Sequence, residues 1–84
     1  MRFSALVEVR TRAGIADPEG ATIEAALPAL GFSDVANVHV GKAIRLEVEA
    51  DSAEAARARL DELCRTFLTN PVLEDAELTL VGGQ

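Results

Sequence analysis

Residues 13–32, AGIADPEGATIEAALPALGF, contain the signals for both ends of one helix. Asp17 is a good N-cap, because its carboxylate can accept hydrogen bonds from the free N–H groups of the first turn. Pro18 follows at the first helical position, where a missing N–H costs nothing. Apolar residues then recur at helical spacing, at Ile23, Ala26, Leu27 and Leu30. The stretch predicts an amphipathic helix that begins at Pro18 and stops at Gly31, and Pro28 predicts a kinked or 3₁₀ last turn.

Four other stretches read as strands, because apolar and polar residues alternate along them. They are Arg2–Arg10, Asp34–Val40, Ala43–Ala50 and Val72–Val81. The second and third of these are expected to form a hairpin around Gly41-Lys42.

A second helix is expected from a cap at Asp51 to about Leu68, where Asn70-Pro71 follows and ends it. Its predicted apolar face consists of Ala56, Leu60, Leu63, Cys64 and Phe67. The element order is therefore β-α-β-β-α-β within a single domain, residues 1–84. This order predicts an α+β, ferredoxin-like sandwich, in which two helices lie on one face of one antiparallel four-stranded sheet. In a dimer, strands completed across the two-fold axis are the alternative.

Leu6 and Val81 fall on the strand faces that are otherwise polar. They are either isolated surface residues, which are common, or part of a sheet face that another subunit covers. The second interpretation predicts an oligomer that uses the outer face of the sheet.

The chain is acidic, with a net charge of −6 over 84 residues and a pI near 4.6. This charge argues against nucleic acid and against an anionic membrane as partners. Neither a signal peptide nor a 20-residue apolar run is evident, so a cytoplasmic location is expected. One cysteine and one histidine offer no intramolecular disulfide and no metal-ligand spacing.

The residues that could carry chemistry have simpler structural interpretations. Cys64 lies on the apolar helix face and reads as a small buried hydrophobe, and His39 reads as a surface or interface histidine. The glycines of Gly14–Gly20 suggest a phosphate loop, but Pro18 removes one N–H and Asp17 places a negative charge at the anion position. No catalytic, cofactor-binding or metal-binding residue is therefore predicted in this chain.

Four motifs in order give the chain a family resemblance. They are the GIADPEG loop (Gly14–Gly20), Leu30-Gly31-Phe32, the VANVHVGK segment (Val35–Lys42) and NPVLED (Asn70–Asp75). Together they resemble the small, PurS-type subunit of phosphoribosylformylglycinamidine (FGAM) synthase, over essentially the whole chain. The departures are Ala76, where an aromatic residue is common, and Pro28.

The resemblance implies a non-catalytic subunit of a ligase and glutamine amidotransferase complex in purine biosynthesis. A large synthetase subunit of that complex uses ATP and Mg, and a glutaminase subunit releases ammonia. The small subunit, a homodimer or a dimer of dimers, bridges the two and supports ammonia transfer during conversion of formylglycinamide ribonucleotide to the amidine. The residues expected to shape the contact loops are Gly14, Asp17, Pro18, Gly20, Gly41, Lys42, Asn70 and Pro71.

Two other classes of function remain open at the level of sequence. A dimeric ferredoxin-like regulatory module would bind a small ligand in a cleft between a helix and a strand. An acylphosphatase-type enzyme is suggested by Arg10, Arg12 and Asn37, but the glycine-rich loop with its embedded arginine is missing.

Overall fold

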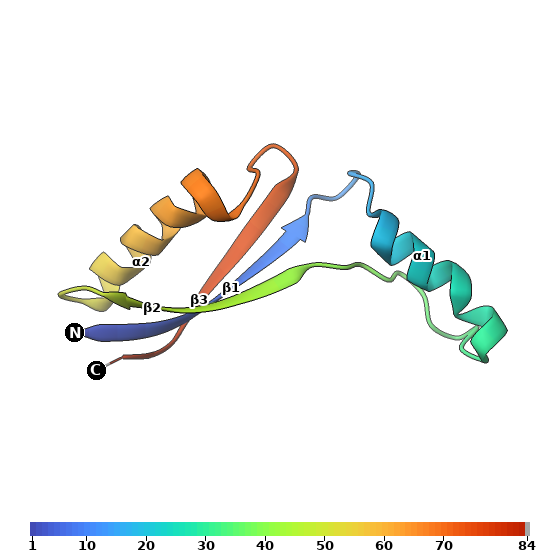
Figure 1. Cartoon of the computed structure of the whole chain (residues 1–84), viewed down its shortest axis with the longest axis horizontal. Helices are drawn as coiled ribbons and strands as arrows, with labels where there is room; N and C mark the ends of the chain where they lie inside the picture. The colour runs from blue at the N-terminus through green and yellow to red at the C-terminus, as the bar shows by residue number, and fades with distance from the viewer. Residues whose placement is uncertain (84) are drawn as a thin grey trace.

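The computed structural model describes residues 1–83, which form three strands and two α-helices (Figure 1). The chain begins with strand β1 (Arg2–Thr11), followed by helix α1 (Pro18–Ala26) and a 3₁₀ turn (Pro28–Leu30). Strand β2 (Lys42–Glu49), helix α2 (Ala53–Leu63), a π-helical turn (Cys64–Leu68) and strand β3 (Glu74–Gly83) complete it. Among the described residues, no helix is long and apolar enough to cross a bilayer.

The three strands form an antiparallel sheet in the order β2-β1-β3. One face of the central strand β1 is covered by α2, because Phe3, Ala5, Val7 and Val9 alternate with outward-facing residues. The other buried apolar side chains are Ala56, Leu60 and Cys64 from α2 and the turn that follows it. This sheet, α2 and the π turn are called the body below.

Helix α1 lies beyond the end of the sheet instead of over its face (Figure 1). Residues 13–41, called the arm below, run out from β1, turn at the far end and return as an extended segment into β2. The molecule measures 52 × 26 × 14 Å and has a radius of gyration of 16.5 Å. A compact domain of this length has a radius of gyration of about 12 Å. The single chain is therefore extended.

The expectation of four strands with both helices on one face is wrong for the described residues. The segment 34–40 pairs with no strand, and no hairpin forms around Gly41-Lys42. The extended segment instead lies against α1, where the carboxylates of Glu24 and of the N-cap Asp17 accept hydrogen bonds from the N–H groups of Val38 and Val40, respectively. Gly41 leads directly into β2, where Lys42 pairs with Val9.

The helix signals of the arm are confirmed. The Asp17 carboxylate accepts a hydrogen bond from the Gly20 N–H, and Pro18 is the first residue of α1. The helix ends at Ala26, and Pro28 begins the 3₁₀ turn predicted from its missing N–H. Gly31 ends that turn with φ of 93°, in the left-handed region that favours glycine.

The second helix differs from its prediction at both ends. Ser52, and not Asp51, is the N-cap, since its hydroxyl accepts a hydrogen bond from the Ala55 N–H. At the other end the α-helix stops at Leu63 and continues as the π turn, in which the Thr69 N–H reaches the Cys64 carbonyl. Phe67 was expected on the apolar face, but it is 80% exposed.

Candidate functional site

The loops predicted to shape contacts meet at one end of the sheet, at the base of the arm. Strand β1 pairs there with the first residue of β2, Lys42, and with the first residue of β3, Glu74. The Arg12 N–H donates to the Leu73 carbonyl at 2.8 Å, which joins the start of the arm to the turn before β3. The segments 14–20, 41–42 and 70–75, far apart in sequence, are therefore close in space.

Asp17 fastens the two sides of the arm together. One carboxylate oxygen accepts from the Gly20 N–H at 3.1 Å and caps α1, and the other accepts from the Val40 N–H at 2.9 Å. The side chain is only 15% exposed. The hydrogen bond from Val40 and then that from Gly20 lower the pKa of Asp17, because both stabilise the ionised carboxylate. Burial opposes this shift, and the nearby His39 adds to it to a smaller extent.

Glu24 and Gly20 extend this fastening along α1. The Glu24 carboxylate accepts from the Val38 N–H at 2.8 Å, so the N-cap residue and one residue of α1 together hold alternate N–H groups of one extended segment. At Gly20, an added Cβ would lie 2.5 Å from the Val38 carbonyl oxygen and 2.5 Å from the Asp17 carboxylate. Gly20 thus allows helix and segment to approach closely. Asp17, Glu24, Gly20 and the segment 38–40 are called the clasp below.

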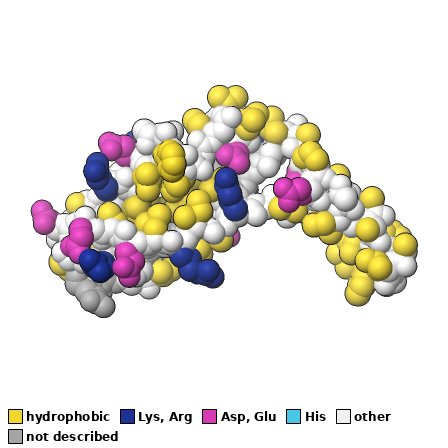
Figure 2. Space-filling view, viewed as in Figure 1, with side chains coloured by type: hydrophobic (Ala, Val, Ile, Leu, Met, Phe, Trp, Pro, Cys, Tyr) yellow, Lys and Arg dark blue, Asp and Glu magenta, His cyan; other side chains and the backbone are white. Residues whose placement is uncertain are grey.

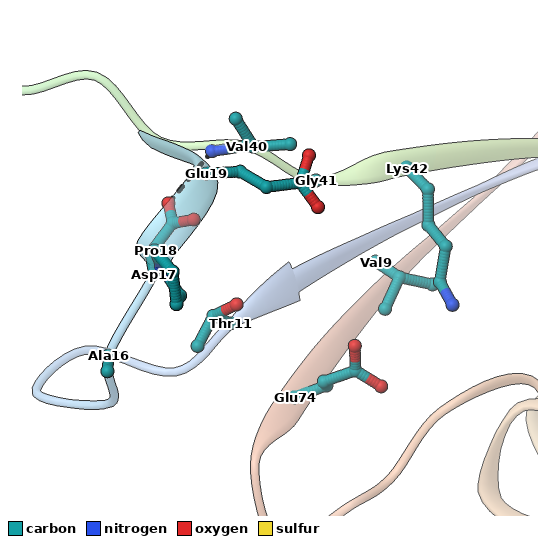
Figure 3. A pocket seen from close by; sticks show the side chains of 10 residues that line it. All are labelled: Val9, Thr11, Ala16, Asp17, Pro18, Glu19, Val40, Gly41, Lys42 and Glu74. Carbon is teal, nitrogen blue, oxygen red and sulfur yellow. Dashed lines mark hydrogen bonds between the residues drawn. The ribbon is translucent and has the colours of Figure 1, made fainter. Parts of the chain in front are cut away.

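A cavity of about 570 Å³ opens where the arm leaves the body (Figure 3). Asp17, Glu19 and Glu74 bring carboxylates to its wall, and Lys42 brings an ammonium group. Gly41 forms part of the wall because β1 passes very close: an added Cβ would lie 2.6 Å from the Val9 carbonyl oxygen. The reason for this glycine is close packing, whereas the sequence suggested a tight reversal.

His39 lies beside Asp17, with 3.6 Å between its Nδ1 and the carboxylate, and its side chain is 81% exposed. Both oxygens of Asp17 already accept backbone N–H groups, so this carboxylate serves as a structural brace. Cys64 is buried in the core below α2, where burial raises the pKa of its thiol. The prediction that Cys64 is a small buried hydrophobe is confirmed.

Asn70 and Pro71 form an exposed turn before β3. The Asn70 side-chain oxygen accepts from the Val72 N–H at 3.1 Å, and its main-chain carbonyl accepts from the N–H groups of Leu73 and Glu74. The Glu74 carboxylate in turn accepts from the Asn70 N–H at 2.9 Å. These bonds present Pro71 and Val72 to solvent next to the arm base.

Leu6 and Val81 lie away from this end, on the sheet face opposite α2. They line a shallow depression of about 350 Å³ together with Ser4 and Arg45. Leu6 is half-buried, and Val81 is 62% exposed. Their part in an oligomer stays a prediction.

Sequence reasoning missed the contributions of Glu24 and Gly20. Glu24 reads as an ordinary polar residue of an amphipathic helix, and its partner Val38 lies 14 residues away in the chain. Gly20 falls inside a helix, where glycine is unfavourable, and that local misfit was the available signal of a close backbone approach.

The fold and this end of the molecule define a class of protein: a small, extended α+β chain in which the loops predicted to shape contacts gather at the base of a projecting arm. The PurS family model, described as phosphoribosylformylglycinamidine (FGAM) synthase, matches residues 4–82. The chain belongs to the PurS family.

Individual relatives agree with this assignment. The FGAM synthase subunit PurS of Methanocaldococcus jannaschii is 36% identical over 76 residues, which cover 90% of this chain and 92% of that protein. The crystal structure of the PurS subunit from Thermotoga maritima matches with a TM-score of 0.89 at 34% identity, covering 96% of this chain and 93% of that one. A chain in the structure of PurLQS from T. maritima matches with a TM-score of 0.89 at 34% identity, covering 96% of this chain and 99% of that one.

Proposed function

We propose that this chain is the PurS subunit of FGAM synthase in purine biosynthesis, a non-catalytic component that joins the other subunits of the complex. The observation that carries the proposal is the match to the PurS family over residues 4–82, together with the likeness to a chain of a PurLQS structure. The large synthetase subunit uses ATP and Mg, and the glutaminase subunit supplies ammonia. This chain bridges the two and supports ammonia transfer in the cytoplasm, as a single domain without a cofactor of its own.

The structure of the site supports a role in contacts. The carboxylate beside its histidine, Asp17, is engaged by two main-chain N–H groups, and the thiol of Cys64 is buried. The arm base offers exposed loops and an open cavity with charged and apolar side chains in its wall. A chain with this arrangement acts by positioning other proteins.

The surface area supports self-association through the arm. A compact protein of 8.9 kDa is expected to expose about 4,800 Å². This chain exposes 6029 Å². The excess of roughly 1,200 Å² exceeds the ~800 Å² that each partner buries in a standard interface. The arm exposes apolar side chains, which Figure 2 shows along the arm to its tip; Ile23, Leu30, Phe32 and Val35 are among the exposed residues.

The body has a groove that would take a helix from a second copy in the proposed homodimer. On the sheet face that carries α2, a groove of about 330 Å³ runs between α2 and β2. Its apolar lining comes from Leu46, Val48, Leu60 and Leu63. In the proposed homodimer the arm of each copy covers the groove of the other. Helix α1 of one copy then lies beside α2 of its partner, and together they form the two-helix layer of a ferredoxin-like sandwich. The extended segment after α1 then provides the fourth strand across the dimer.

The test is amidine formation by the purified large and glutaminase subunits, with and without this chain. Glutamine serves as the nitrogen donor in one set of reactions and free ammonia in the other. We expect glutamine-driven synthesis to require this chain and ammonia-driven synthesis by the large subunit to proceed without it. If adding the chain changes neither reaction, the proposed function is wrong.

A further inference from the structure

The extended segment 38–41 and strand β2 form one continuous extended stretch, whose main-chain groups point alternately to two opposite edges (Figure 1). The Val9 carbonyl points at this stretch, because an added Cβ on Gly41 would lie 2.6 Å from its oxygen. Lys42, which lies opposite Val9, therefore directs its main-chain groups toward β1. The Val40 N–H points to the same side, where the Asp17 carboxylate accepts it (Figure 3). Even-numbered residues of the stretch thus face β1 and α1, and odd-numbered residues face the other edge.

This second edge is open. Strand β2 is the last strand on its side of the sheet, and within residues 1–83 no hydrogen bond engages the main-chain N–H of His39 or Gly41. An extended edge with free N–H and C=O groups is a template for another strand. The odd-numbered edge of residues 39–49 is called the open edge below.

The opposite edge of the sheet, along β3, is partly covered. Val7 directs its main-chain groups to the same side as Val9, toward β2, so its partner in β3, Leu78, directs its carbonyl away from the sheet. The Arg57 guanidinium of α2 donates to that carbonyl at 3.5 Å. The two edges therefore differ, and the open edge along β2 is the one available for pairing.

We propose that the open edge pairs with the same edge of a second copy, antiparallel, about a two-fold axis that passes between the two Ala43 residues. This inference rests on the homodimer of the proposed function, and it specifies which edges meet and in which register. A two-fold axis makes such an interface self-complementary, because each contact from one copy to the other occurs twice.

The apolar side chains of the stretch support this register. Odd-numbered residues of one copy must lie opposite odd-numbered residues of the other, so that their main-chain groups can bond. With Ala43 opposite itself, Val40 lies opposite Leu46 of the second copy, and Val38 lies opposite Val48. All four of these apolar side chains are half-buried in the single chain. The pairing therefore continues the apolar face of the sheet across the dimer.

Neighbouring registers are less favourable. A shift of the pairing in one direction places Lys42 directly opposite itself, and like charges in that position are destabilising. A shift in the other direction moves Val38 beyond the end of β2. With Ala43 on the axis, a small residue lies opposite itself, and His39 lies opposite Glu47 of the second copy, a pair that can hydrogen-bond.

Disulfide cross-linking tests the register, with Ala43→Cys as the variant and Lys42→Cys as its matched control. In the proposed pairing the Cα atoms of the two copies are about 5.5 Å apart at position 43, within the range that a disulfide spans. At position 42 they are about 8 Å apart, which is too far. After oxidation with diamide, we expect Ala43→Cys to give at least about tenfold more covalent dimer than Lys42→Cys. Peptide mass spectrometry then shows whether the bond joins the two introduced thiols or involves Cys64.

Hydrogen exchange in the unmodified chain tests the edge without a substitution. The N–H groups of Arg45 and Glu47 belong to the open edge, and should exchange at least about tenfold more slowly at dimer concentrations than in the dilute monomer. Those of Ile44 and Leu46 face β1 and should be protected in both. Sedimentation velocity establishes the oligomeric state of each sample.

The outcomes separate this inference from the proposal on which it rests. A chain that sediments as a monomer at every concentration overturns the homodimer, and the pairing with it. A dimer that Lys42→Cys cross-links instead of Ala43→Cys overturns the pairing alone. A dimer in which the Arg45 and Glu47 amides exchange as fast as in the monomer does the same, and this measurement decides the matter if a variant does not associate. The amidine assay of the proposed function is independent of all three results.

Discussion

The body and the arm are stabilised by different interactions. In the body, β1 buries four alternate side chains against α2, so burial of apolar surface holds the sheet and helix together. In the arm, Gly20 alone among residues 13–41 is buried, and α1 is fastened by Asp17 and Glu24 to main-chain N–H groups. The body has a core of its own, whereas the arm has directional contacts and an exposed apolar surface, which the proposed homodimer would cover.

The largest effect is expected on the free energy of unfolding, when a Leu→Ala substitution in the body is compared with one in the arm. Leu60→Ala in the body removes a side chain that is 2% exposed, and we expect it to lower the free energy of unfolding by about 2–5 kcal/mol. Leu30→Ala in the arm removes one that is 68% exposed, and should change that free energy by less than about 0.5 kcal/mol in the monomer. Urea unfolding at low protein concentration measures both values.

Higher protein concentration sharpens this comparison. If the arm docks on a second copy, Leu30→Ala becomes destabilising as concentration rises, since association stabilises the folded chain by mass action. A large loss for Leu30→Ala in the dilute monomer would contradict the division into body and arm.

The next effect concerns the clasp. In Gly20→Ala the new methyl group meets the Val38 carbonyl, which is main chain and cannot move aside easily, so the segment must separate from α1. We expect the opening free energy at the Val38 and Val40 amides to fall by about 1–3 kcal/mol in hydrogen exchange. Gly82→Ala is the matched control, because nothing lies within 4 Å of its added Cβ. Equal protection in both variants would show that the clasp does not depend on this close approach.

Acid should release the clasp before it unfolds the body. The pKa of Asp17 is lowered in the folded chain, so its contribution to stability is present in full above the ordinary aspartate pKa of about 3.9. That contribution is lost as pH falls through the lower, folded pKa. We therefore expect protection of the Val40 amide to decline below about pH 4. Asp17→Asn should reduce that protection already at neutral pH and remove its acid dependence.

Asp34→Asn is the control for this pH effect, since Asp34 is an exposed carboxyl of the same arm. It should keep the acid dependence of the unmodified chain. An unchanged pH profile in Asp17→Asn would assign the acid sensitivity to another carboxylate.

Local rules predicted those parts of the structure that depend on neighbours in sequence. The cap at Asp17, the 3₁₀ turn at Pro28 and the strand along β1 all follow from short-range chemistry or alternation, and the structure has them. The prediction of a fourth strand was wrong because segment 38–40 has the alternating pattern of a strand, but the N–H groups of Val38 and Val40 bond to the carboxylates of Glu24 and Asp17 instead of to a neighbouring strand. The prediction that Phe67 lies on the apolar face was wrong because helical periodicity assumes an unbroken α-helix. The π turn adds one residue to the last turn, so that Leu68 faces the core in place of Phe67. The predicted contact loops are brought together by the sheet pairing of Val9 with Lys42 and of Thr11 with Glu74, which no single segment of sequence contains.

The smallest expected effect tests whether His39 belongs to the clasp. Its ring approaches Asp17 at 3.6 Å but is 81% exposed, and a pair so open to solvent is weakened by water and salt. Removing the ring in His39→Gln should therefore change the opening free energy at the Val40 amide by at most about 0.5 kcal/mol. Hydrogen exchange at neutral pH, with Asp17→Asn alongside, makes the comparison direct. A loss in His39→Gln as large as that in Asp17→Asn would mean that the histidine holds the carboxylate in place. The two sides of the arm would then be held together by a side-chain pair, and not by bonds to main-chain N–H groups alone.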